Sequence, residues 1–155
     1  MSINNDPAYV AEQTGKVISA RMTTQPLEEL QGEARSATVT EAMGALVTFE
    51  GIVRDHDGGQ RVKNLTYTAH PSAQQEIEAV VARISAEHPN TRMWVAHRTG
   101  PLTIGEIAFL VLVASAHRGD AFAACSAVAD AVKAEVPIWK EQELLDGSAQ
   151  WVGLE

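Results

Sequence analysis

The chain has 155 residues, a formal net charge of −8 and a pI of about 5.1. This length is typical of one domain, so we expect a single domain over residues 1–155. The acidity argues against a nucleic-acid partner, and no segment reaches the roughly 20 apolar residues that cross a bilayer. A hydrophobic content of 45% with 21% charged residues indicates an ordinary globular protein.

The cysteine content and the first residues bear on where the protein works. Cys125 is the one cysteine, which excludes an internal disulfide and fits a reducing compartment. The N-terminus lacks the basic start and the apolar stretch of a secretory signal, so we expect a cytoplasmic protein. Cys125 lies among alanines of a predicted helix, where a free cysteine is usually a small buried hydrophobe and not a nucleophile.

The first forty residues give weak signals. Residues 1–20 are polar and weakly periodic, and we expect them to be partly mobile. Thr24 is a candidate N-cap for a short helix in which Leu27 and Leu30 face inward.

A β-hairpin is predicted next. Gly44–Arg54 is rich in β-branched and aromatic residues, which favours a strand. Asp57–Gly59 supplies residues that adopt positive φ in a tight turn, and Val62–Ala69 returns as the second strand. Two glycines are too few for a phosphate-binding loop, so this segment is interpreted as a turn.

The middle of the chain combines one helix with two strands. Ser72 and Gln75 have the spacing of a capping box, which predicts a helix start. A strand is expected over Met93–Arg98, a turn over Thr99–Pro101, and a central strand, apolar on both faces, over Glu106–Ser115. The apolar stripe of the helix consists of Ile77, Val80, Val81 and Ile84.

The C-terminal part predicts a second long helix and a last strand. Asp120 is a candidate N-cap for that helix, and Gln150–Val152 is a candidate edge strand after a turn at Asp146. Because hairpins and helices mix without a repeated βαβ order, the fold class is α+β. The residues expected to share the inner face of the second helix are Phe122, Ala129, Val132 and Val136.

Two basic residues stand where the central strand gives way to the second helix. His117 and Arg118 lie at a helix N-terminus, where free N–H groups and the helix dipole attract anions. Arg54 ends another predicted strand and could converge on the same anion. The alternative is a surface pair of Arg118 with Asp120 beside a solvated histidine.

Two lysines lie near the end of the same helix. Lys133 is beside the apolar face, so it either extends to solvent or is desolvated and able to exchange protons near neutral pH. Lys140 follows Pro137 and cannot share the helix face, but an extended segment could aim it back toward Lys133.

Other polar residues give weaker signals. His97 and Arg98 end a strand and are either a second anion contact or simply a polar strand end. The five histidines have neither H-x-H nor H-x-x-x-H spacing, and there is no C-x-x-C, so we expect no metal site.

Four motifs in this order and spacing resemble the catalytic (large) subunit of molybdopterin synthase. They are F-E-G-I-V-R at Phe49–Arg54, H-R-T-G at His97–Gly100, S-A-H-R at Ser115–Arg118, and Lys133 followed by V-P-I-W-K-E at Val136–Glu141. The resemblance runs from about Gly44 to Trp151. The combination is specific, whereas each motif alone would be weak.

The resemblance implies an α/β hammerhead-type fold with a mixed, mostly antiparallel sheet and packed helices. It implies a homodimer with a small ubiquitin-like sulfur-carrier subunit at each end, whose C-terminal Gly-Gly thiocarboxylate enters a pocket of the large subunit. Two sulfurs are then transferred to cyclic pyranopterin monophosphate, a pterin phosphate, to give the molybdopterin dithiolene. The resemblance implies no cofactor, and no metal is needed for the sulfur step.

The resemblance also assigns roles to individual residues. Lys133 and Lys140 match the catalytic lysines, and Phe49 matches an aromatic residue of the pocket wall. Relatives often continue with a basic tail after the position of Trp151, and Arg98 is a candidate to replace a cation from that tail. The substrate-anion contacts implied by the resemblance are Arg54, His117 and Arg118.

Two other classes of function remain open. One is a non-catalytic dimeric module that binds an anionic metabolite, which would need Arg54 and Arg118 but not Lys133. The other is a scaffold in which the lysines are solvated and Trp139 and Trp151 fill the core or a dimer contact.

Overall fold

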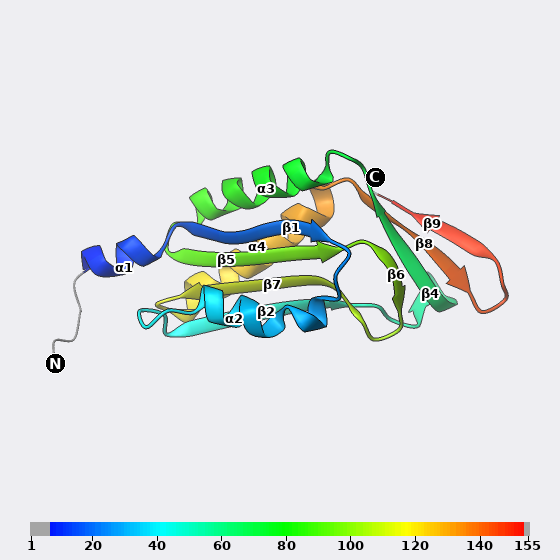
Figure 1. Ribbon diagram of the computed structural model, residues 1–155, viewed down its shortest axis with the longest axis horizontal. Coiled ribbons are helices and arrows are strands. Elements are labelled where there is room, and N and C mark those ends of the chain that lie inside the picture. Colours follow the sequence, from blue (N-terminus) through cyan, green and yellow to red (C-terminus); the bar gives the residue numbers. More distant parts are fainter. Residues whose placement is uncertain (1–6, 154–155) are drawn as a thin grey trace.

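The computed structural model describes residues 7–153, and its first sheet has the strand order β1-β5-β7-β2 (Figure 1). β1 pairs in parallel with β5, and the other neighbours are antiparallel. Every residue of β7 is buried, which makes it the central strand that its apolar sequence predicts. The four strands are β1 (Lys16–Thr23), β2 (Ala45–Ile52), β5 (Thr91–Arg98) and β7 (Ile107–Ser115).

Helices cover both faces of this sheet (Figure 1). α3 (Ala73–Glu87) and α4 (Arg118–Glu135) pack on one face, where they meet Phe109, Val111 and Val113 of β7. The short helix η1 (Leu27–Glu29) and α2 (Gln31–Thr38) pack on the other face with Leu110 and Leu112. Successive side chains of β7 therefore enter two separate cores. α1 (Pro7–Gln13) precedes β1.

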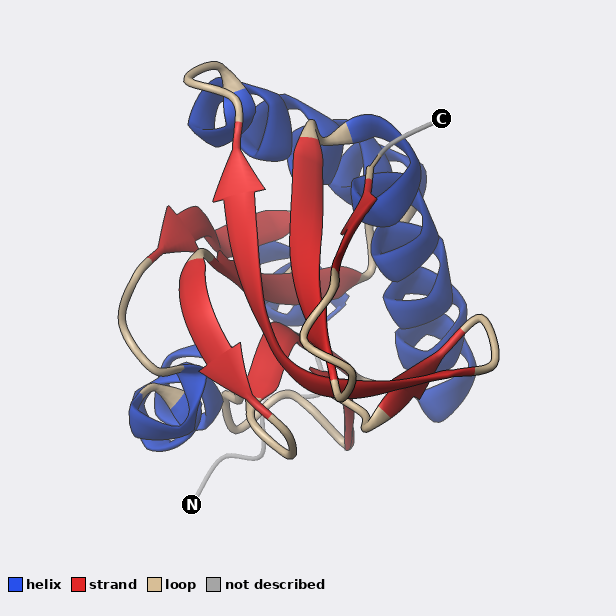
Figure 2. Ribbon diagram, turned by 90° about the vertical axis from the view of Figure 1, so that its right-hand side faces the viewer, coloured by secondary structure: helices blue, strands red, loops and turns tan. Residues whose placement is uncertain are grey.

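A second sheet stands across one end of the first (Figure 2). Its order is β3-β4-β8-β9, and β6 also pairs with β4. A small core of Val53, Leu65, Leu102 and Ala108 lies where the two sheets meet. The strands are β3 (His56–Asp57), β4 (Gln60–Ala69), β6 (Gly100–Thr103), β8 (Ile138–Leu144) and β9 (Ala149–Val152).

The predicted α+β class and the mostly antiparallel sheet are confirmed. The apolar stripe of α3 is buried as expected. β9 covers the predicted strand Gln150–Val152 and pairs with β8 at the end of the second sheet. Leu27 and Leu30 are buried, although they belong to η1 and its C-cap, and no side chain caps the start of η1.

The predicted hairpin has a different first strand. Gly58 and Gly59 adopt φ of 56° and 80° and form the expected turn. However, β4 pairs there with the two residues of β3, while β2 pairs with β7. The chain crosses from the first sheet to the second between β2 and β3, a change of sheet that leaves no periodic signal.

A regular strand, β1, begins at Lys16, within the segment in which we expected partial mobility. Ala20 and Met22 pack on the α3 side of the sheet, whereas Ile18 packs on the α2 side. A register shift between Val17 and Ser19 accounts for the difference and interrupts the alternation of the strand. Residues 1–6 lie outside the described part of the chain.

Helix starts and one turn also differ from the prediction. Ser72 precedes α3 but makes no capping hydrogen bond, because its hydroxyl donates to Glu76. His117, not Asp120, is the N-cap residue of α4. Phe122 is 61% exposed, since the buried face of α4 runs through Ala121, Ala124 and Val128 instead. The predicted turn at Thr99–Pro101 becomes β6 from Gly100 on, paired with β4.

Candidate active site

A cavity of about 450 Å³ lies between the two sheets and the C-terminal end of α4. Residues from β2, β4, β5, β7, α4 and β8 line it, so the site exists only once both sheets have formed. Four of the predicted site residues are in its wall: Phe49, Arg54, Lys133 and Lys140.

The three cations of the cavity come from separate elements. Arg54 follows β2 and is exposed, and Lys140 lies on β8 with 25% of its side chain exposed. Lys133 is an exposed residue in the last turn of α4, where the helix dipole favours a positive charge. Within residues 7–153, no carboxylate is at salt-bridge distance from Lys133. The extended segment after Pro137 does turn Lys140 toward the same cavity as Lys133, as the sequence suggested.

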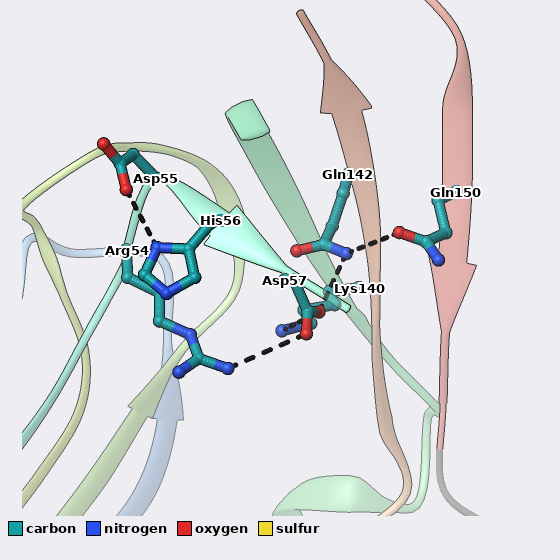
Figure 3. A network of polar contacts seen from close by, with 7 residues as sticks. All are labelled: Arg54, Asp55, His56, Asp57, Lys140, Gln142 and Gln150. Atoms are coloured by element: carbon teal, nitrogen blue, oxygen red, sulfur yellow. Dashed lines mark hydrogen bonds and ion pairs between the residues drawn. The ribbon is translucent and has the colours of Figure 1, made fainter. Parts of the chain in front are cut away.

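Lys140 belongs to a polar network that also contains Asp57 and Gln142 (Figure 3). Asp57 Oδ2 is 3.3 Å from Lys140 Nζ, and Asp57 Oδ1 is 3.7 Å from Arg54 Nη2. Gln142 Nε2 donates to Asp57 Oδ2 at 3.0 Å and to Gln150 Oε1 at 3.1 Å. Burial alone would raise the pKa of Asp57, but Lys140, Gln142 and Arg54 together lower it below its ordinary value.

Aromatic rings form another part of the cavity wall. His97 packs edge-on against Tyr67 with ring centroids 4.9 Å apart, and against Phe109 at 5.3 Å. Phe109 in turn meets Phe49 edge-on at 5.8 Å. Burial and the charge of Asp57 raise the pKa of Tyr67, so its phenol stays protonated.

His97 is a neutral member of this wall. It is 7% exposed, and burial, together with the nearby Lys133, lowers its pKa to about 4 although its bond to Arg98 opposes the shift. Nδ1 is 2.9 Å from the carbonyl oxygen of Arg98, which can only accept, so Nδ1 carries the proton. Nε2 is then an acceptor, and no donor hydrogen-bonds to it within residues 7–153. His97 is thus part of the cavity wall without being a cation.

Three predicted site residues lie elsewhere. Arg98 does not line the cavity: its side chain is 11% exposed and pairs with Glu106 at 3.2 Å, which makes it unavailable to replace a missing cation. His117 and Arg118 line a shallow depression with Gly44 and Gly119 at the N-terminal end of α4. Arg118 and Lys133 are separated by about 22 Å along the helix axis, so one chain does not bring them together.

Sequence reasoning missed Asp57, Tyr67 and Gln142. Asp57 was expected only as a turn residue, and Gln142 is an isolated glutamine with no motif around it. Their roles depend on the pairing of β4 with β8, which places Tyr67 opposite Lys140. The one available signal was period two in β8, which puts Lys140 and Gln142 on the same face of the strand.

The described part of the chain gives little support for a metal site, a cysteine nucleophile or a membrane-spanning helix. Over residues 7–153 no three His, Cys, Asp or Glu side chains are grouped so that they could hold a metal ion. Cys125 is buried, and burial raises the pKa of its thiol to about 11, as expected for a core residue. The helices within the same residues are too short or too polar to cross a membrane.

Sequence comparisons identify relatives along most of the chain. The model of the MoaE protein family matches residues 22–135. The molybdopterin synthase catalytic subunit of Staphylococcus carnosus is 38% identical over 133 residues, which cover 85% of this chain and 87% of the relative. Molybdopterin synthase catalytic subunit 1 of Mycobacterium tuberculosis is 37% identical over 134 residues, 86% of this chain and 89% of the relative.

Solved structures agree with these relatives. Molybdopterin synthase from Staphylococcus aureus superposes with a TM-score of 0.78 at 34% identity, over 86% of this chain and 96% of that chain. A complex of subunits 1 and 2 of the molybdopterin-converting factor from Helicobacter pylori shares the fold, with a TM-score of 0.61 at 22% identity over 90% of this chain and 87% of that chain. With a family match over most of its length and relatives this similar, the chain belongs to the MoaE protein family.

Proposed function

We propose that this chain is the catalytic subunit of a molybdopterin synthase and acts in molybdenum cofactor biosynthesis. Its relatives in Staphylococcus carnosus and Mycobacterium tuberculosis bear that name and match it over most of their length. The reaction is the transfer of two sulfurs, one from each of two thiocarboxylated carriers, to cyclic pyranopterin monophosphate, which gives the dithiolene of molybdopterin and leaves each carrier as a carboxylate.

The observation that supports this reaction best is the convergence of Arg54, Lys133 and Lys140 on one cavity. Both reactants are anions, one a thiocarboxylate and the other a cyclic phosphate. Cations held around a partly enclosed space stabilise such groups more strongly than cations in open water. In an acidic protein, three of them at one cavity are not a consequence of composition.

The two lysines have different environments and, in this proposal, different roles. Lys133, which has no carboxylate partner within residues 7–153, delivers and accepts protons as sulfur adds to carbon and the cyclic phosphate opens. Lys140, paired with Asp57, supplies positive charge to the thiocarboxylate. Phe49 and the aromatic wall give the carrier tail and the pterin an apolar surface.

The sulfur donor is a separate small carrier protein in this proposal. The Helicobacter pylori structure is described as a complex of two subunits of the molybdopterin-converting factor, which is a precedent for such a partner on this fold. A C-terminal Gly-Gly segment has no side chains and can enter a narrow opening that other residues would block. Its terminal thiocarboxylate would then lie among the three cations.

His117 and Arg118 require a second copy of the chain if they contact substrate. They stand at the far end of α4 from the cavity, about 22 Å from Lys133 along the axis. We infer a homodimer in which these two residues of one protomer complete the anion site of its partner.

The proposal is tested by comparing the chain with its Lys133→Ala variant. Both are supplied with a thiocarboxylated carrier and cyclic pyranopterin monophosphate, and dithiolene product is measured. We expect a rate loss of about 10² to 10⁴ in the variant, because its proton-transfer group is removed. Carrier affinity should persist, since Arg54 and Lys140 remain. Binding of both reactants with no turnover by the unaltered chain would instead favour the non-catalytic binding module.

A further inference from the structure

Asp57 is the one carboxylate among the described residues that line the cavity, beside three cations. It is at the turn end of β3, and its side chain is 25% exposed. One oxygen faces Lys140 Nζ at 3.3 Å and the other faces Arg54 Nη2 at 3.7 Å (Figure 3). It therefore contacts two of the three cations, one in the segment after β2 and the other on β8.

Gln142 donates a hydrogen bond to Asp57 Oδ2, the same oxygen that faces Lys140. The side chain of Gln142 is 2% exposed, and both hydrogens of its amide are used, one toward Asp57 and one toward Gln150 (Figure 3). Because both acceptors are oxygens, only one orientation of the Gln142 amide satisfies them. The chain of contacts from Gln150 through Gln142 to Asp57 thus ends on Lys140.

We propose that Asp57 is a positioning residue that holds the ammonium of Lys140 at the cavity. A lysine has a long flexible stem, and without a fixed partner its charge samples many positions. Lys133 needs no such partner in a proton-transfer role, whereas a residue that acts through its field must keep its charge in one place. The consequence for turnover rests on the proposed function, but the effect on Lys140 does not.

The effect on Lys140 is measured first, by NMR of protein with ¹⁵N in its lysine side chains. An ammonium held in an ion pair exchanges slowly and gives an observable signal. We expect the Lys140 signal in the unaltered chain, its loss in Asp57→Asn and its retention in Asp55→Asn. Asp55 is a matched control because its carboxylate pairs with His56 and Arg61 instead. An unchanged Lys140 signal in Asp57→Asn would overturn the proposal.

A double variant that moves the carboxylate from position 57 to position 142 distinguishes a positioning role from a structural one. Lys140 and Gln142 lie on the same face of β8, so a carboxylate at position 142 is within reach of the Lys140 side chain. In the double variant Asp57→Asn with Gln142→Glu, the new amide at 57 can donate to the new carboxylate, and the Gln150 amide can turn to donate as well. We expect the double variant to recover the Lys140 signal, whereas a merely structural role for Asp57 predicts no recovery.

Turnover gives the second readout. Asp57→Asn should lower kcat by about 10-fold to 100-fold, as for a misplaced reacting group, with the KM for the carrier changed much less. The double variant should restore most of kcat. A loss confined to KM, or no rescue of kcat, would contradict the positioning role. If the unaltered chain has no turnover, the proposed function fails, and the NMR result alone decides whether Asp57 positions Lys140.

Discussion

Individual residues of the cavity differ sharply in their electrostatic state. Lys140 has a carboxylate 3.3 Å from its nitrogen, while Lys133 has none within residues 7–153. His97 is held neutral between Tyr67 and Phe109, with its Nδ1 proton bound to a backbone carbonyl. The site thus combines a paired cation, an unpaired cation and a neutral acceptor around one cavity. This division allows charge stabilisation and proton transfer to be performed by separate groups.

The buried His97 predicts an acid dependence of stability. Its pKa is about 4 in the folded chain and about 6.5 in the unfolded chain. Between pH 4 and pH 6.5 the unfolded state therefore binds a proton at His97 that the folded state does not bind. Above pH 6.5 the neutral His97 costs the folded state nothing. As the pH falls toward 4, the free energy of unfolding decreases by about 3 kcal/mol in all. Urea unfolding at several pH values should show this loss in the unaltered chain but not in His97→Gln. Equal pH slopes in the two proteins would refute it.

Elements with a clear periodic pattern could be predicted from sequence, and those defined by distant pairing could not. The unbroken apolar run of β7 and the apolar stripe of α3 predict burial directly, because the residues of the run and of the stripe all face a core. β1 is different, because a register shift after Val17 moves its inner residues from one face to the other. β6 is only four residues long and its sequence indicates a turn, so its strand conformation comes from pairing with β4.

The candidate site divides in the same way. Phe49, Arg54, Lys133 and Lys140 could be predicted because they lie within motifs of recognisable order. Asp57 could not be predicted as a site residue. An aspartate before a glycine is common in hairpin turns, and its partner Lys140 is 83 residues away in the sequence. Arg98 was expected to contact substrate, but in the fold its side chain pairs with the carboxylate of Glu106.

The edge strand β1 gives a prediction at the level of elements. Its outer side is not left open: the Met22 N–H donates to Gln74 Oε1 at 2.8 Å, and Gln74 Nε2 donates to the carbonyl of Ala20 at 3.1 Å. Gln74 on α3 therefore takes the place of a neighbouring strand.

Replacing Gln74 should expose the edge of β1. We expect Gln74→Ala to speed hydrogen exchange at the Met22 amide by about tenfold, the equivalent of one hydrogen bond. Gln75→Ala is the matched control, because the neighbouring Gln75 side chain is exposed. Exchange at Met22 that is equal in both variants would show that Gln74 does not protect this edge.

At the scale of the whole molecule, the proposed site residues of one chain are divided between its two ends. The cavity end of α4 carries Lys133, and the opposite end carries His117 and Arg118. A helix is rigid over this length, so no local motion joins the two ends. The homodimer that we propose would bring opposite ends of two chains together.

Subunit complementation tests this arrangement. Lys133→Ala and Arg118→Ala should each be inactive as homodimers. In a mixed dimer one cavity carries both substitutions and the other carries neither, so part of the activity should return when the two variants are unfolded together and refolded. Activity that stays absent in verified mixed dimers would place both residues in the cavity of a single chain, and full activity of the Arg118→Ala homodimer would place Arg118 outside the site.

The most direct measurement of the central claim is a single-turnover reaction of the unaltered chain with a thiocarboxylated carrier and cyclic pyranopterin monophosphate. Mass spectrometry follows the carrier terminus, and product analysis follows the pterin. We expect the carrier to change from thiocarboxylate to carboxylate as the dithiolene forms, at a rate that depends on Lys133. A carrier that binds and keeps its sulfur, with the pterin unchanged, would contradict the assignment of this chain as a catalytic subunit.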